Sequence, residues 1–97
     1  MKISELRAGM GNVNIKARVI KKEETRTVNT KNGARRVANL VIEDEDKNTI
    51  KLSLWEDEIE KVKEGDEIEI ENGYVSEFRG ELQLSLGRYG KIISLKH

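Results

Sequence analysis

Apolar and polar residues alternate along several stretches of the chain, which is the pattern of strands with one buried face. The first stretch covers 13–20, the second 35–43 and the third 49–55. The pair Asn32-Gly33 lies between the first two and favours a tight turn. These stretches predict three strands whose alternate side chains fill one core.

The period of the pattern changes over 56–64. Ile59 and Val62 are three residues apart there, and Gly65 follows. This spacing indicates a helical turn, and a glycine often follows the last turn of a helix. The segment predicts one short helix that places two apolar side chains on the core.

A fourth strand is expected to begin at Ile68 and to continue through Val75. Its alternation changes phase near Asn72-Gly73, and a glycine at such a point is typical of a β-bulge. The bulge predicts that Val75 turns inward and that Tyr74 turns outward.

The fifth strand has the cleanest alternation, over 81–86. We expect the glycines of 87–90 to end it, and 91–95 forms a final apolar segment. Three strands, a short helix and two strands follow in the order of the OB-fold. The prediction is an all-β, five-stranded OB-fold barrel with a short helix between strands 3 and 4. The predicted core consists of Val13, Ile15, Val19, Leu40, Ile42, Ile50, Leu52, Leu54, Ile68, Ile70, Val75, Leu82, Leu84 and Leu86.

A chain of 97 residues predicts a single domain over 1–97. It contains no cysteine and one histidine, His97, so a disulfide framework, a thiolate metal site and a histidine-based catalytic triad are excluded. The acidic run 44–46 is typical of a turn between strands. We therefore expect no metal site, no cofactor and no enzymatic activity. No apolar run reaches the about 18 residues of a membrane span, and we expect a cytoplasmic protein, nucleoid-associated in a prokaryote.

Charge is balanced overall but divided along the chain. The 18 basic and 18 acidic residues cancel. Segment 16–36 holds eight basic residues against two acidic ones, whereas 43–71 holds four basic against thirteen acidic. The division indicates one face suited to a polyanion and another that is not.

Three of the four aromatic residues indicate a surface for stacking flat rings. Side chains alternate across a strand, so Trp55 shares an outward face with Lys51 and Ser53. Phe78 lies at the turn before the fifth strand, and we expect it to lean over the same face close to Trp55. Such rings can stack on nucleic-acid bases of any sequence. The complete predicted nucleic-acid site is Trp55, Phe78, Tyr74, Arg79, Lys51, Ser53, Lys31, Arg35, Arg36, Gln83 and Arg88.

Several motifs in order cover nearly the whole chain: Ile3-x-x-Leu6-x-x-Gly9-Met10-x-Asn12-Val13, 52–57, Gly65-Asp66, Gly73-Tyr74-x-Ser76-x-Phe78-Arg79-Gly80, Leu82-x-Leu84 and Gly87-Arg88. In this set the chain resembles single-OB-fold proteins related to archaeal replication protein A and to simple single-stranded DNA-binding proteins of the human sensor type. The resemblance implies sequence-tolerant binding of single-stranded DNA in replication, repair or recombination, without catalysis. It also implies that Trp55, Tyr74 and Phe78 stack on bases. Some relatives carry a further aromatic where this chain has Ser85.

Two alternatives remain open from the sequence. One is an OB domain that binds RNA or tRNA. The other is a protein-interaction module of a replication complex, in which the apolar segment 92–95 docks a partner. Other OB domains or repair and replication proteins are possible partners, and the chain could be one module of a longer protein.

Overall fold

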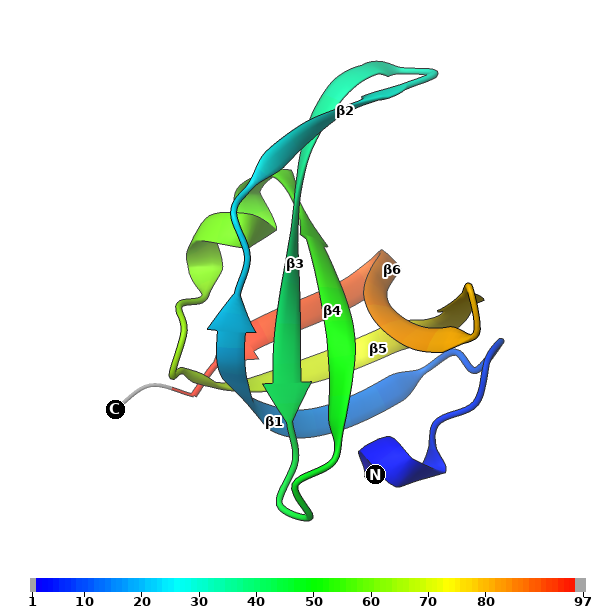
Figure 1. Ribbon diagram of the computed structural model, residues 1–97, viewed down its shortest axis with the longest axis vertical. Coiled ribbons are helices and arrows are strands. Elements are labelled where there is room, and N and C mark those ends of the chain that lie inside the picture. Colours follow the sequence, from blue (N-terminus) through cyan, green and yellow to red (C-terminus); the bar gives the residue numbers. More distant parts are fainter. Residues whose placement is uncertain (1, 96–97) are drawn as a thin grey trace.

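The computed structural model describes residues 2–95, with the backbone alone at 87–89. Six strands form one sheet in the order β1-β5-β6-β4-β3-β2, and a further pairing of β1 with β3 closes the sheet into a ring (Figure 1). The prediction of an all-β OB-fold is confirmed, although with six strands rather than five. The strands are β1 (Val13–Lys22), β2 (Arg26–Thr30), β3 (Gly33–Glu43), β4 (Thr49–Trp55), β5 (Glu67–Phe78) and β6 (Glu81–Ser94). Two 3-10 helices are η1 (Ile3–Glu5) and η2 (Glu56–Lys61).

The additional strand is β2, which the sequence pattern hid. Within the part of the chain that the structure describes, it pairs only with β3, from Arg26 opposite Val37 to Thr30 opposite Gly33, and this hairpin projects beyond the ring (Figure 1). Four of its five residues are exposed, so β2 has no buried face and no alternation to reveal it. The predicted turn at Asn32-Gly33 is confirmed, and the Thr30 hydroxyl donates to the Gly33 carbonyl at 2.8 Å.

The interior of the ring is filled by the inward residues of β1, β3, β4, β5 and β6. Leu40, Leu52, Leu54, Ile70 and Leu84 are fully buried. The predicted core is confirmed except for Leu82 and Leu86, which are only partly buried and pack against it. The short helix is confirmed between β4 and β5, where it buries Ile59, although it ends at Lys61 rather than at 64.

The predicted bulge in β5 is confirmed. The pairing of β5 with β6 shifts between Glu71 and Gly73, and Asn72 has a φ of 56°. A Cβ on Gly73 would lie 3.0 Å from a methyl group of Ile70, so only glycine fits without a shift of its neighbours. Beyond the bulge Val75 is buried and Tyr74 is exposed.

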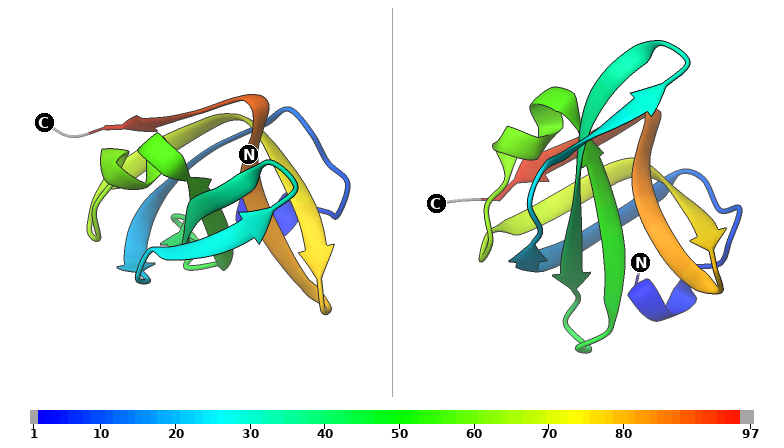
Figure 2. Two further views of the ribbon diagram at one scale, coloured as in Figure 1. Left: turned by 90° about the horizontal axis from the view of Figure 1, so that it is seen from above. Right: turned by 45° about the horizontal axis from the view of Figure 1, so that its top comes forward.

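The prediction that 87–90 ends a strand is wrong. β6 continues through this segment and pairs with β5 on both sides of it, at 81–86 and again at 91–94. Figure 2 shows β6 turning sharply between its orange and red parts. Glycine permits a tight bend of a strand, and here it bends β6 around the ring without ending it.

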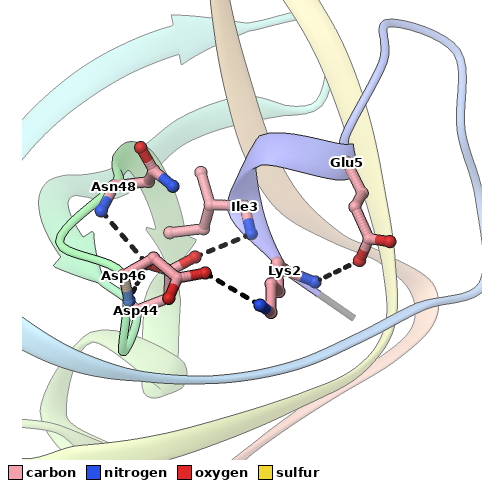
Figure 3. A network of polar contacts seen from close by, with 6 residues as sticks. All are labelled: Lys2, Ile3, Glu5, Asp44, Asp46 and Asn48. Atoms are coloured by element: carbon pink, nitrogen blue, oxygen red, sulfur yellow. Dashed lines mark hydrogen bonds and ion pairs between the residues drawn. The ribbon is translucent and has the colours of Figure 1, made fainter.

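The N-terminal segment closes one end of the ring. Ile3 and Leu6 are buried in the core. The Asp44 carboxylate, in the turn between β3 and β4, accepts the backbone N–H of Ile3 at 2.9 Å and those of Asp46 and Asn48 at 3.0 Å (Figure 3). Lys2 adds an exposed ion pair to Asp46 at 3.1 Å. One carboxylate therefore shapes the turn and holds the segment that covers the core.

Replacing Asp44 with asparagine should lower the free energy of unfolding by about 1–3 kcal/mol, because one of the two acceptor oxygens becomes an NH₂ group and at least one of the three backbone N–H groups loses its acceptor. Burial alone would raise the pKa of Asp44, but the three backbone donors outweigh it and hold the pKa below its ordinary value of 3.8. A depressed pKa contributes stability that is complete above the ordinary value and is lost as the pH falls through the folded-state value. Urea unfolding at pH 7 and in the acid range measures both effects.

The matched control for this substitution is Asp46→Asn. Asp46 carries the same charge in the same turn, but its side chain is exposed and meets Lys2 at the surface, where such a pair contributes little. Asp44→Asn should lose both stability and part of the acid sensitivity, whereas Asp46→Asn should lose little of either. Equal losses would show that Asp44 does not hold the N-terminal segment.

Candidate functional site

Strand register places the outward side chains of β5, β6, β4 and β3 on one continuous surface, which we call the outer face. Residues directly opposite one another in a sheet point to the same side. Ser76 on β5 lies opposite Gln83 on β6, Gln83 lies beside Lys51 on β4, and Ser53 lies opposite Asn39 on β3. The outer face consists of Tyr74, Ser76, Phe78, Glu81, Gln83, Ser85, Lys51, Ser53, Trp55, Val37, Asn39 and Val41.

The two aromatics of β5 are the most accessible rings on this face. Phe78 is 63% exposed and Tyr74 is 45% exposed. They lie four residues apart on one strand, which leaves about 13 Å between them at the usual rise. β5 runs through Phe78, so only Arg79 and Gly80 form the turn before β6. The Arg79 guanidinium lies 5.2 Å from the centre of the Phe78 ring.

Trp55 ends β4 and lies at the far end of the outer face from Phe78. It is half-buried, it lies opposite the buried Val37, and the Arg35 guanidinium lies 5.9 Å from the centre of its ring. Phe78 pairs with Glu81, six strand positions from the level of Trp55, which is roughly 20 Å along the strands. The expectation that these two rings lie close together is therefore wrong.

A chain of polar side chains forms the floor between the aromatic residues. The Gln83 side-chain amide donates to the Ser53 hydroxyl, which donates to the Asn39 side-chain carbonyl at 3.1 Å. The Ser76 hydroxyl donates to the Gln83 backbone carbonyl at 3.5 Å. Ser53 is only 7% exposed, so it supports the surface from below. Asn39 was missed by sequence analysis, because only the pairing of β3 with β4 places it beside Ser53.

Three of the six predicted basic residues lie next to carboxylates. Lys51 meets Glu81 at 3.3 Å, Arg35 meets Glu56 at 3.7 Å, and Arg36 meets Glu60 at 3.2 Å. These pairs are exposed or half-buried and therefore weak. Phosphates could replace the carboxylates as partners of the same cations.

Lys31 and Arg79 are the predicted basic residues that form none of the ion pairs found within residues 2–95. Lys31 is exposed at the tip of the hairpin, and Arg79 is exposed in the turn beside Phe78. Arg26 was missed by sequence analysis, yet it lines a hollow with Lys51 and Phe78. The side chain of Arg88 lies outside the described residues.

Acidic residues surround Trp55. Glu56, Asp57 and Glu58 line a hollow with Trp55 and Arg35. Burial raises the pKa of Glu58, although Lys61 and the backbone N–H of Trp55 act in the opposite direction. An anionic ligand therefore meets more favourable charge near Arg26, Lys51 and Arg79 than beside Trp55.

The described residues offer no site for a metal ion. No cluster of three or more histidine, cysteine, aspartate or glutamate side chains is positioned to hold one within 2–95. The oxygens of Asp44 accept backbone N–H groups, and Asp46 pairs with Lys2. In the same part of the chain, no helix is long and apolar enough to cross a membrane.

Comparison with known proteins identifies relatives over nearly the whole chain. The single-stranded DNA binding protein Ssb of Saccharolobus solfataricus is 36% identical over 91 residues, which is 94% of this chain; the chain spans 61% of the length of that relative. The second OB-fold domain of replication protein A from Methanococcus maripaludis superposes with a TM-score of 0.81 at 27% identity, covering 100% of this chain and 95% of that domain. The OB domain of Ta0387 from Thermoplasma acidophilum reaches a TM-score of 0.84 at 22% identity, with coverage of 100% and 87%, and shares the fold.

A match to a protein family agrees with these comparisons and covers the residues of the outer face. The profile of the family described as single-stranded DNA binding protein Ssb-like, OB fold, matches residues 6–94. The matched segment contains all six strands and every residue of the outer face. The chain therefore belongs to the Ssb-like OB-fold family of single-stranded DNA binding proteins.

Proposed function

We propose that this chain binds single-stranded DNA across the outer face, without strong preference for sequence, in replication, repair or recombination. The observation that carries the proposal is the continuous face on which three aromatic rings surround a polar floor. Every base has a flat face that can stack on such a ring. The separation of Trp55 from Phe78 favours a site that spans several nucleotides rather than two neighbouring bases.

The phosphates would follow the basic edge of this face. Arg79 and Arg26 flank Phe78, Lys51 lies on the floor, and Lys31 and the Arg35-Arg36 pair lie along the projecting hairpin. A phosphate that reaches Lys51 would take the place of Glu81, and one that reaches Arg35 would take the place of Glu56. These exchanges need only side-chain movement at the surface.

Titration of the protein with a short oligo-dT tests the proposal directly. Trp55 is the only tryptophan of the chain, so a change in its fluorescence reports on ligand at one end of the outer face. Parallel measurement of anisotropy with a labelled oligo-dT detects binding that leaves Trp55 unaffected. Saturable binding in either measurement supports the proposal, and no binding in both would refute it.

An oligo-U of the same length, titrated under the same conditions, separates DNA from RNA as the ligand. Tighter binding of oligo-U would replace single-stranded DNA by RNA in the proposal. In the segment of the protein-docking alternative, Ile92 is buried and 91–94 pairs with β5, whereas Ile93 stays exposed. Absence of binding to either oligomer would favour that alternative. We propose that residues 1–97 act as one binding module without catalytic activity, in a cytoplasmic, nucleoid-associated setting and beside other OB domains or repair proteins.

Replacing Arg79 with alanine should weaken binding to all sequences alike. Each cation that meets a phosphate releases counterions, so the slope of log affinity against log salt should flatten by about 0.7 for one lost contact with a single strand. Titrations at four or more salt concentrations measure the slope. Lys63→Ala, at an exposed lysine away from the outer face, is the control and should keep the wild-type slope. An unchanged slope for Arg79→Ala would remove Arg79 from the site.

A further inference from the structure

We propose that Asn39, Ser53 and Gln83 form a reversible hydrogen-bond relay that lets the outer face accept bases with either a donor or an acceptor at their edge. The inference rests on the proposed binding of single strands and adds a reason for its tolerance of sequence. Stacking explains why the flat ring of any base can bind. It does not explain how the polar groups at the edge of a base, which hydrogen-bond to water in the free strand, find new hydrogen-bond partners on the protein.

The relay joins three strands at the centre of the outer face. Gln83 comes from β6, Ser53 from β4 and Asn39 from β3. Register places Asn39 opposite Ser53 and Gln83 beside Lys51, two positions from Ser53 along β4, so the Gln83 side chain reaches the Ser53 hydroxyl diagonally. The Ser53 hydroxyl lies between the two amides and is nearly closed off from solvent. Asn39 and Gln83 also line a hollow beside Phe78, so a base stacked on that ring would lie next to both amides.

A single proton sets the direction of the relay. The Ser53 hydroxyl can donate to one amide only, and it accepts a hydrogen bond from the other. In the structure it donates to Asn39 Oδ1 and accepts from Gln83 Nε2. No hydrogen bond within residues 2–95 engages Asn39 Nδ2 or Gln83 Oε1. The relay therefore presents a donor at Asn39 and an acceptor at Gln83.

Half a turn of both amides reverses this pattern without changing the shape of the floor. The oxygen and nitrogen of an amide exchange places, and the two atoms are nearly equal in size. Asn39 Nδ2 would then donate to Ser53, and the hydroxyl would donate to Gln83 Oε1. Cytosine carries an amino donor where thymine carries a carbonyl acceptor. At Gln83, the observed orientation presents an acceptor to the amino group of cytosine, and the reversed orientation presents a donor to the carbonyl of thymine. Each base therefore finds a hydrogen-bond partner.

Locking the relay should create a base preference. Asn39→Asp leaves only an acceptor at position 39, which forces the Ser53 hydroxyl to donate there and keeps Gln83 Oε1 pointing outward. We expect the ratio of affinity for oligo-dC over oligo-dT to rise about five- to tenfold above that of wild type, the effect of one hydrogen bond. Ser85→Asp adds the same charge to the outer face outside the relay, and it should weaken both oligomers while leaving their ratio unchanged.

The Ser53→Ala background distinguishes a relay from a direct contact at position 39. Without the hydroxyl, the substitution at Asn39 no longer constrains Gln83. In this background, Asn39→Asp should therefore change the ratio of affinity for oligo-dC over oligo-dT by less than about twofold. Such a dependence of one substitution on another is what a double-mutant cycle measures for coupled residues. An equal change in both backgrounds, or no change in either, would overturn the relay. Thermal unfolding of each variant confirms that the compared proteins are folded.

Nuclear magnetic resonance of the wild-type protein gives a test that requires no variant. The side-chain NH₂ signals of Asn39 and Gln83 should shift in opposite directions between the oligo-dC and oligo-dT complexes. Signals that shift together, or that do not differ between the complexes, would overturn the relay while leaving the binding proposal intact. Failure of the wild-type protein to bind either oligomer would overturn both.

Discussion

Replacing Leu84 with alanine should lower the free energy of unfolding by about 2–5 kcal/mol, the usual loss for a fully buried leucine. Leu84 is completely buried, lies opposite Val75 on β5 and lies beside Leu52 on β4. It therefore joins the two halves of the ring, and its removal leaves a cavity that neighbouring strands cannot fill without breaking register. Urea unfolding followed by circular dichroism gives the loss, and Leu52→Ala should give a similar one.

Leu82→Ala provides the control on the same strand. Leu82 has the same inward phase, two positions earlier, but it is only partly buried. The identical substitution should therefore cost clearly less than at Leu84. If both variants lost the same stability, burial in the ring would not explain the effect and the assignment of the core would fail.

Replacing Phe78 with alanine should weaken binding of single strands by about 1–3 kcal/mol, the range for loss of one aromatic stack. Phe78 is the most exposed large apolar residue described, so the folded protein loses little when it is removed. Binding and stability should separate: affinity for oligo-dT falls, and the midpoint of urea unfolding stays near that of wild type. Phe78→Tyr keeps a flat ring and should retain most of the affinity.

Ile93→Ala is the control for loss of exposed apolar surface. Ile93 is 39% exposed and lies on the C-terminal part of β6, paired with the beginning of β5 rather than with its aromatic end. The Ile93→Ala variant should bind oligo-dT with the affinity of the wild-type protein. A Phe78→Ala variant with unchanged affinity would exclude Phe78 from the interface. Trp55→Ala should also weaken binding by about 1–3 kcal/mol, but its partial burial beside Val37 requires the same stability control.

Alternation of apolar residues was sufficient to predict those strands that have one face in the core. It also located the phase change at Asn72-Gly73, because burial switches there from Ile70 to Val75. It missed β2, which has no buried face, and it ended β6 at glycines that bend the strand instead. Local pattern reports which side chains are buried, not which strands become neighbours.

The same limit explains which residues of the candidate site could be predicted from the sequence and which could not. Parity within one strand correctly grouped Trp55, Lys51 and Ser53 on one side. Asn39 and Arg26 join them only through pairings of β3 with β4 and with β2. The ion pair of Arg35 with Glu56 joins residues from two elements, and nothing in either segment alone indicates it.

The projecting hairpin also bears on how copies of this protein behave toward one another. Among the described residues 2–95, β2 has a hydrogen-bonded neighbour on one side only, so its other side presents backbone groups to which a strand of another molecule could add. Such an open edge is a template for aggregation. β2 is five residues long, mostly polar and begins with an arginine, and these are features that discourage strand addition. β2, which the sequence pattern did not predict, thus extends beyond the ring and at the same time disfavours polymerisation of the protein through its open edge.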